Sequence, residues 1–227
     1  MSFSIPDGLA PEVYPLAWLV GSWRGEGVIS YPGIDAVAFL QDVTFDHDGG
    51  PYLRYESTIR VIEPVVPSTV PEEWAQSSAD ASTGSADGPG PADASADVVD
   101  EAAGSVDGLT PAVPPLGTGE TTVWSTETGY WRVPPERPDG LGEGKTPLEV
   151  MMSDPAGRLT LYLGSVGNGR VDLASDLIAR TPTSAEVTAS SRLYGLVEGN
   201  LMWVWELAAF GQPLQSYVSA NLSRVEG

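Results

Sequence analysis

Apolar and polar residues alternate along most of this chain with a period of two. From Leu53 to Val61, every second residue (Leu, Tyr, Ser, Ile, Val) belongs to a largely apolar set, with Arg, Glu, Thr and Arg between them. Successive side chains of a β-strand point to opposite faces, so this pattern predicts a strand with one apolar face. Similar runs lie at Ser22–Tyr31, Ala36–Phe45, Thr121–Val133, Leu148–Met152, Arg158–Val166, Arg170–Arg180, Glu186–Val197, Leu201–Phe210 and Tyr217–Val225. They predict about ten strands in all, and the longest stretch with a helical period is near Pro11–Val20.

Short turn sequences separate these strands. Examples are Asp48–Pro51 (DGGP), Asp154–Gly157 (DPAG), Gly167–Gly169 (GNG) and Glu198–Asn200 (EGN). Strands joined by such turns pair as antiparallel hairpins. The periodicity fits a barrel or a sandwich, and an up-and-down barrel is the simpler choice because closure leaves no free sheet edge. We therefore predict an all-β fold, an antiparallel barrel of about ten strands whose interior can hold one small ligand.

One segment, Pro64–Gly119, departs from the strand pattern. Its 56 residues include no Lys or Arg, nine acidic residues and a single aromatic residue, Trp74. A segment with so few apolar residues cannot bury enough apolar surface to offset the entropy lost on ordering. We therefore expect a disordered acidic loop. Closing a loop of this length costs about 2 kcal/mol more than closing a short turn, which one domain can absorb. We therefore expect residues 1–227 to form one barrel domain interrupted by residues 64–119, an insertion that is either tolerated or recruits a basic partner.

The net charge and the missing residue types exclude several functions. The chain has 31 Asp and Glu against 11 Lys and Arg, and its net charge of −20 repels nucleic acid and anionic lipid. It has no cysteine and one histidine, His47, which excludes thiolate sites and multi-histidine metal sites within one chain. Residues Met1–Glu12 lack the features of a secretory signal, and the apolar run Leu201–Phe210 is too short to span a membrane. We expect a cytoplasmic protein with no nucleic-acid or membrane partner and no metal site.

Three separated motifs resemble those of the nitrobindin family. The first, Gly21–Gly27, reads GSWRGEG and fits the pattern G-x-W-x-G-x-G; the second is Glu127–Arg132 and the third is Gly211–Gln215. In this order they are similar to nitrobindins, calycin-like small barrels that resemble fatty-acid-binding proteins. The resemblance extends over nearly all of the chain outside the acidic segment.

The first motif also has a direct physical use. Gly21, Gly25 and Gly27 let a first strand bend and let a neighbouring backbone approach closely, and Trp23 can plug one end of a barrel. We expect this motif to close the barrel and to take no part in chemistry.

The resemblance implies a cofactor and an activity, and three residues depart from what it implies. Nitrobindins hold ferric haem b through a histidine on the last strand, bind nitric oxide and convert peroxynitrite to nitrate. Their closing pattern G-Q-P-L-Q-x-H-L-S-A reads GQPLQSYVSA here, so Tyr217 stands at the position of the iron ligand. At two further haem-pocket positions of the family, Ala185 replaces a lysine and Ser125 replaces a histidine. We therefore expect no haem, no cofactor and no catalytic residue.

Tyr217 remains the alternative haem ligand. A tyrosinate can bind ferric haem, but a phenol with a pKa of about 10 needs a nearby cation to ionise at neutral pH. No Lys or Arg lies close to Tyr217 in the sequence. His47 belongs to a turn, Phe45–Gly50, that lies away from the haem in the family, and we expect it to be solvated rather than to replace the ligand.

Other enzyme classes receive little support. A Ser-His-Asp hydrolase would need His47, and no G-x-S-x-G motif occurs. The sequence Gly25–Gly27 lies within a predicted strand and opens no helix, so it is not a dinucleotide fingerprint. Paired carboxylates for glycosidase chemistry stay open, because an acidic barrel offers many.

Two strand faces bear on the nature of the cavity. Trp203 and Trp205 share an apolar face, which predicts core packing or a wall for an apolar ligand. Tyr217, Ser219 and Asn221 share a polar face, which would make the cavity polar if it points inward.

Three functional hypotheses follow. The first is a non-enzymatic nitrobindin-like barrel that lacks the haem ligand and binds an unidentified small molecule. The second is a haem-b-binding peroxynitrite isomerase, or nitric oxide-binding protein, that uses Tyr217. The third is a carrier of a small apolar molecule, which rests on the barrel shape alone.

Overall fold

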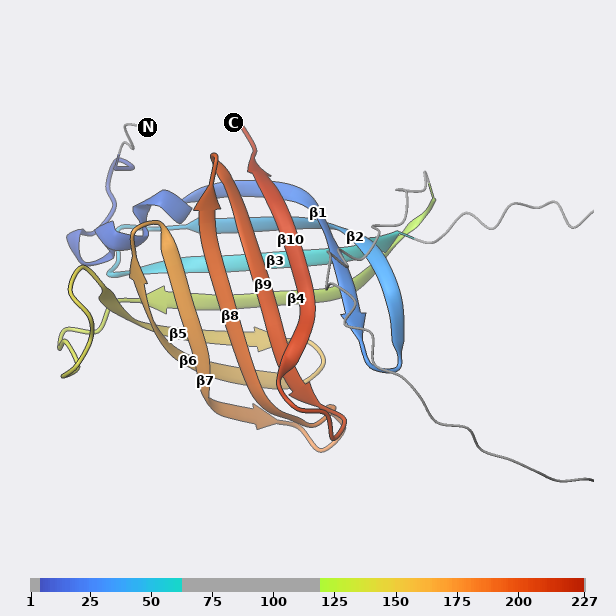
Figure 1. The fold of residues 1–227 in the computed structure, drawn as a ribbon. Coiled ribbons are helices and arrows are strands. Elements are labelled where there is room, and N and C mark those ends of the chain that lie inside the picture. Colours follow the sequence, from blue (N-terminus) through green and yellow to red (C-terminus); the bar gives the residue numbers. More distant parts are fainter. Residues whose placement is uncertain (1–4, 63–118, 227) are drawn as a thin grey trace, which may run out of the picture. The chain divides into compact units, whose positions relative to one another are not determined.

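The computed structural model describes residues 5–62 and 119–226, which form one short helix and ten strands (Figure 1). The 3₁₀ helix η1 spans Pro11–Leu19. The strands are β1 (Gly21–Tyr31), β2 (Ile34–Asp46), β3 (Tyr52–Ile62), β4 (Thr121–Arg132), β5 (Thr146–Asp154), β6 (Arg158–Gly167), β7 (Arg170–Arg180), β8 (Val187–Val197), β9 (Asn200–Ala209) and β10 (Gln215–Arg224). Each predicted strand is present.

The ten strands close into a barrel. Every strand pairs antiparallel with the next along the chain, and β10 returns to pair with β1. This confirms the predicted up-and-down antiparallel barrel and excludes the sandwich. The predicted acidic loop, Pro64–Gly119, lies outside the described residues except at Gly119. No helix in the described part of the chain has the length and apolar character needed to cross a membrane.

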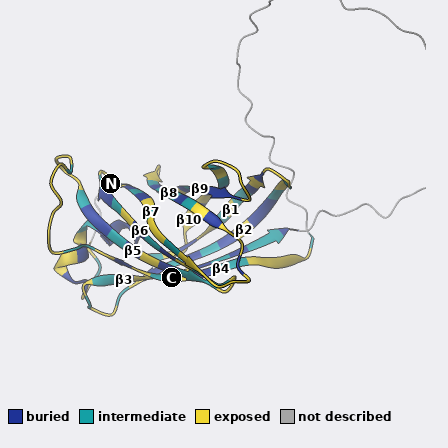
Figure 2. Ribbon diagram, turned by 90° about the horizontal axis from the view of Figure 1, so that it is seen from below, coloured by how far each residue is buried: buried dark blue, intermediate teal, exposed yellow. Residues whose placement is uncertain are grey.

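Buried and exposed residues follow one another along the strands (Figure 2). On β3, Leu53, Tyr55 and Ile59 are buried, whereas Arg54 and Glu56 are exposed. The same alternation on the other strands brings large aromatic side chains into the barrel. The period-two pattern therefore fixes which face of each strand forms the core.

Helix η1 lies at one end of the barrel (Figure 1). The indole Nε1 of Trp23 on β1 donates to the main-chain oxygen of Leu19, at 2.8 Å. The guanidinium of Arg224, at the end of β10, lies 4.2 Å from the centre of the Trp23 ring and donates to the main-chain oxygen of Trp18, at 2.7 Å. These contacts join the helix to the first and last strands, so this end of the barrel is closed.

Two glycines of the first motif lie where β1 approaches its neighbours. A Cβ at Gly25 would collide with the backbone of Asn221 on β10, and one at Gly27 would collide with Ser219 and with the ring of Phe39. Close pairing of β1 with β10 therefore depends on glycine at both positions.

Two β-bulges change the direction of single side chains at the other end of the barrel. On β4, Ser125 pairs with Ile59 and Val123 pairs with Arg60, so Trp124 is an extra residue. On β10, Ser216 and Val218 pair with consecutive residues of β9, so Tyr217 is an extra residue. A bulge interrupts the alternation and turns the extra side chain toward a different face.

Candidate functional site

The barrel end opposite η1, here called the mouth, is built around Tyr217. Its ring packs edge-on against two aromatic rings, that of Tyr31 with centres 5.8 Å apart and that of Trp205 with centres 5.1 Å apart. The indole Nε1 of Trp124 donates to the Tyr217 hydroxyl oxygen, at 2.9 Å. Tyr217 is half-buried and lies at the edge of the core.

Burial raises the pKa of Tyr217 above its ordinary value of 10.0. The hydrogen bond from Trp124 and the charge of Arg158 on β6 act in the opposite direction without reversing this effect. A cation therefore does face Tyr217, although none lies near it in the sequence. The phenol nevertheless keeps its proton at neutral pH.

The inward face of β10 is not the polar one. Val218, Ala220 and Leu222 are buried, whereas Ser219 and Asn221 are exposed. Tyr217 reaches the interior only because the bulge adds one residue before Val218. The condition for a cavity made polar by Ser219 and Asn221 is therefore not met.

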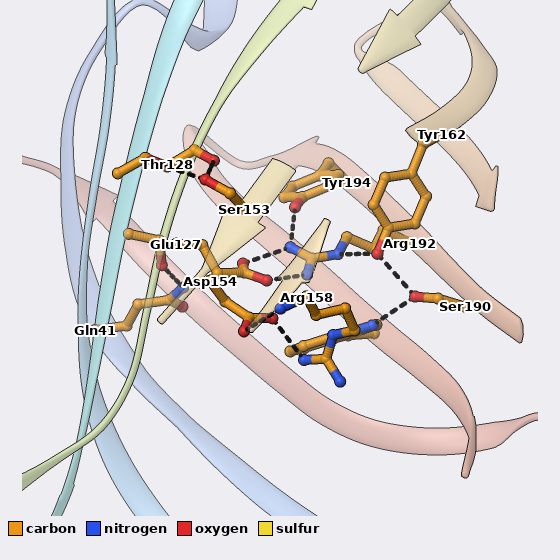
Figure 3. A network of polar contacts seen from close by, with 12 residues as sticks. Gln41, Glu127, Thr128, Ser153, Asp154, Arg158, Tyr162, Ser190, Arg192 and Tyr194 are labelled. Atoms are coloured by element: carbon orange, nitrogen blue, oxygen red, sulfur yellow. Dashed lines mark hydrogen bonds and ion pairs between the residues drawn. The ribbon is translucent and has the colours of Figure 1, made fainter. Parts of the chain in front are cut away.

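The barrel interior is polar for another reason, a buried ion pair between β8 and β4. The Nη1 of Arg192 donates to Glu127 Oε2 at 2.8 Å, and Nη2 donates to Glu127 Oε1 (Figure 3). Only 1% of the Arg192 side chain and 10% of the Glu127 side chain are exposed. Burial lowers the pKa of Arg192, but the neighbouring Glu127 and tyrosines outweigh it and raise this pKa well above its ordinary value. The guanidinium is therefore always charged.

Tyrosine and tryptophan side chains surround this ion pair. Arg192 Nε donates to the Tyr162 hydroxyl at 3.2 Å, and Nη1 donates to the Tyr194 hydroxyl at 3.4 Å. The guanidinium lies 4.1 Å from the centre of the Trp205 ring. Cation–π contact and hydrogen bonds offset part of the desolvation of the charge.

Two hydrogen-bonded chains extend the network across the core. The Ser190 hydroxyl lies 2.8 Å from both Trp205 Nε1 and the Tyr162 hydroxyl. Trp203 Nε1 donates to Gln41 Oε1 at 2.8 Å, and Gln41 Nε2 donates to the Ser57 hydroxyl at 2.9 Å. Both tryptophans of the β9 stripe thus pack in the core with their indole N–H groups satisfied.

A second ion pair lies at the mouth. Asp154 ends β5 and Arg158 begins β6, and the turn between them sets Arg158 Nη2 2.8 Å from Asp154 Oδ2 (Figure 3). The Asp154 side chain is 9% exposed and the Arg158 side chain is 16% exposed. A pocket of about 250 Å³ opens beside this pair. Its lining is Trp124, Ser125, Thr126, Glu127, Asp154, Pro155, Ala156, Arg158 and Trp205.

The other residues that the sequence singled out, Ser125, Ala185 and His47, do not lie together in the structure. Ser125 lines the mouth pocket, but Ala185 is exposed in the connection between β7 and β8 and is not among the lining residues. His47 lies in the turn between β2 and β3, at the end of the barrel near η1. Within residues 5–62 and 119–226, His, Asp and Glu side chains form no group of three suited to a metal ion.

Sequence reasoning missed three residues of this site, Trp124, Arg158 and Arg192, and gave Glu127 only as the first residue of the second motif, without a role. Arg192 alternates with Ser190 and Tyr194 along β8, and all three are buried. A charged residue at an inward position was therefore a readable signal. The position of Trp124 depends on a bulge, which the alternation does not reveal.

Comparison with known proteins places these features in a family. Residues 12–224 match the family described as the THAP4-like, heme-binding beta-barrel domain. A protein of Beutenbergia cavernae named ferric nitrobindin-like protein is 37% identical and aligns over 99% of this chain and 100% of its own length. A protein of Parafrankia sp. named peroxynitrite isomerase is also 37% identical, over 95% of this chain and 81% of its own length.

The solved structures include a similar barrel. The crystal structure of Rv2717c from M. tuberculosis superposes with a TM-score of 0.59 and 25% identity, over 96% of this chain and 99% of that one. The matched family covers almost all of the barrel, including the mouth. The chain therefore belongs to the THAP4-like, nitrobindin family of heme-binding β-barrel domains.

Proposed function

We propose that this chain is a nitrobindin-like barrel that does not hold haem and that binds a small molecule at its mouth without transforming it. The observation that carries the proposal is the state of Tyr217 at the position of the family's iron ligand. Its hydroxyl oxygen already accepts a hydrogen bond from Trp124, and burial raises its pKa. A protonated phenol is not the tyrosinate that ferric iron requires.

The residues at the mouth do not fit a haem in two further respects. First, the chain's single histidine, His47, lies in the turn near η1, so no imidazole can replace Tyr217. Second, the mouth pocket has a volume of about 250 Å³. Since a cavity of about 150 Å³ holds one benzene ring, this pocket suits a molecule of one or two rings rather than a four-pyrrole macrocycle.

The buried polar network also argues against a carrier of small apolar molecules. The Arg192–Glu127 pair and the hydroxyls of Tyr162 and Tyr194 occupy the space below the mouth. An apolar ligand placed there would leave charged and polar groups without partners, which is costly. Native mass spectrometry of the purified protein tests this: we expect no retained lipid, and a stoichiometric lipid adduct would favour the carrier instead.

The second candidate is a haem-bound peroxynitrite isomerase. Relatives that carry that name, at 37% identity in Parafrankia sp. and 33% in Leifsonia xyli, favour it. On this alternative Tyr217 would hold the iron, and its hydroxyl oxygen would have to give up the hydrogen bond from Trp124. The charge of Arg158, which lowers the pKa of Tyr217, would then have to outweigh burial.

A hemin titration of the purified protein separates the two candidates. Wild type, Tyr217→Phe and Tyr217→His are titrated with hemin, and the visible spectrum is recorded. We expect no sharp Soret band in wild type or Tyr217→Phe. A stoichiometric Soret band in wild type that disappears in Tyr217→Phe would overturn the proposal and favour the isomerase candidate. Tyr217→His shows whether restoring the imidazole is sufficient for binding.

A further inference from the structure

Arg158 keeps hydrogen-bond donors that its own ion pair does not use. Its side chain is only 16% exposed, and Nη2 is the guanidinium nitrogen that contacts Asp154. Within the part of the chain that the structure describes, Nε and Nη1 have no protein acceptor. These nitrogens are not among the buried side-chain atoms that lack a partner, so they are accessible from outside and can donate to a ligand in the pocket that Arg158 lines.

The acidic groups of the pocket are already paired. Glu127 receives two hydrogen bonds from Arg192, and Asp154 is held by Arg158 and by the main-chain N–H of that residue. The hydroxyl of Tyr217 accepts from Trp124, and its own proton has no acceptor among the described residues. The free hydrogen-bonding capacity at the mouth is therefore on the donor side, which suits an anionic ligand.

Two indole rings set the shape of the ligand. Trp124, 44% exposed at the rim, and Trp205, buried in the wall, both line the pocket beside Arg158. Aromatic walls favour a flat apolar body, and the volume of about 250 Å³ limits that body to one or two rings. The two carboxylates of the lining, Glu127 and Asp154, are each balanced by an arginine, and charges farther than about 8 Å away are screened at physiological salt.

We propose that the mouth pocket binds a small planar aromatic carboxylate, with its ring against Trp124 and Trp205 and its carboxylate on Arg158. The inference rests on the proposed function, because a haem would fill the same mouth. It names the chemical class of the ligand that the haem-free barrel holds.

The test compares two probes of the same shape. 2-Naphthoate and the neutral 2-naphthamide are titrated into the wild-type protein, with affinity measured by calorimetry and by the change in tryptophan fluorescence. A charge-assisted hydrogen bond predicts at least about tenfold tighter binding of the carboxylate. Equal affinity for the two probes, or no binding of naphthoate at millimolar concentration, would overturn the inference.

Variants locate the site. Arg158→Gln should lower the affinity for naphthoate to that for naphthamide, and Trp124→Ala should weaken both probes alike. Arg132→Gln is the matched control, because it removes an arginine that pairs with Glu149 on the outer surface and does not line the mouth. Naphthoate affinity that is unchanged in Arg158→Gln would place its binding elsewhere and refute the inference. Since that variant leaves Asp154 unpaired and could unfold, the comparison of the two probes on wild type decides independently.

A hemin titration run in parallel separates the two failures. Hemin binding that depends on Tyr217 refutes the proposed function, and the inference with it. Absence of both hemin and naphthoate binding refutes the inference alone. Naphthoate binding in a protein that does not bind hemin supports both.

Discussion

Trp124 and Tyr217 are the extra residues of two β-bulges, and a hydrogen bond of 2.9 Å joins their side chains. Their strands, β4 and β10, are not neighbours: β3, β2 and β1 lie between them in the closed sheet. The bond therefore connects separate parts of the rim. Without either bulge, the alternation of its strand would turn that side chain to the other face.

A double-mutant cycle measures the strength of this bond. Trp124→Phe, Tyr217→Phe and the double variant each change packing, and the cycle isolates their coupling. We expect a coupling of about 0.5–1.5 kcal/mol in the free energy of unfolding, as for a single neutral hydrogen bond. Urea unfolding at neutral pH provides the measurement. Strictly additive effects would show that the bond contributes nothing in solution.

Breaking the buried ion pair should destabilise the barrel far more than removing it whole. Arg192→Met leaves the Glu127 carboxylate buried without a partner, which costs about 3–5 kcal/mol. In the double variant Arg192→Met/Glu127→Leu no buried charge remains, so we expect most of this loss to be recovered. Guanidinium unfolding of wild type, Arg192→Met and the double variant checks the order.

A surface pair serves as the control for that experiment. Arg132 and Glu149 form an ion pair of 2.9 Å with side chains 47% and 34% exposed. Arg132→Gln should therefore cost less than about 1 kcal/mol. A double variant of the buried pair that is as unstable as Arg192→Met would mean that the ion pair itself, rather than the unpaired charge, is what matters.

The fold could be predicted from the sequence because a period of two is compatible with few secondary structures other than a strand with one buried face. A strand whose pairing slips by one residue exposes its apolar face, so the runs such as Leu53–Val61 fix both the strand and its orientation. Short turns then fix antiparallel neighbours. The position of Trp23 at a closed barrel end follows from the same logic, since a large apolar ring needs a buried place.

The site could be predicted only in part, for two physical reasons. A bulge breaks the period locally, so the alternation gave no sign that Tyr217 packs at the edge of the core on the same strand as the buried Val218 and Ala220. The Arg192–Glu127 pair joins residues on β8 and β4, and its partners are defined only once the barrel closes. The closing motif was sufficient to identify Tyr217 from the sequence, whereas the residues that surround it could be identified only from the folded structure.

The protein should lose stability above about pH 10 because two buried tyrosines resist ionisation. Burial is the main cause that raises the pKa of Tyr55 and of Tyr194 above the ordinary value of 10.0. As the pH rises through 10, the unfolded state loses these protons while the folded state keeps them, so the unfolded state is favoured. The stabilisation is therefore fully present below pH 10 and is lost above it. The urea concentration at the unfolding midpoint should therefore decrease as the pH is raised from 8 to 11.

Tyr194→Phe identifies the groups responsible. Removing one of these tyrosines should reduce the slope of unfolding free energy against pH by up to about 1.4 kcal/mol per pH unit. Lysine contributes little to the comparison, because Lys145 is the only lysine in the chain and its side chain is 48% exposed. An unchanged slope in Tyr194→Phe would assign the alkaline transition to other groups.

Substitution of Gly25 tests whether the first motif serves barrel closure. In Gly25→Ala the new methyl group would meet the main-chain oxygen of Asn221 and the Cα of Leu222, so β1 and β10 must move apart. Overpacking of this kind costs about 1–3 kcal/mol. Gly195→Ala is the matched control: this glycine also lies in a strand, β8, and a Cβ there would meet no atom within 4 Å. Thermal unfolding should show a clear loss for the first variant and little change for the second. Equal stability of the two variants would remove the packing explanation for the motif. Gly25 is not among the residues that line the mouth pocket. We therefore expect Gly25→Ala to keep its affinity for naphthoate when the affinity is measured below the melting temperature.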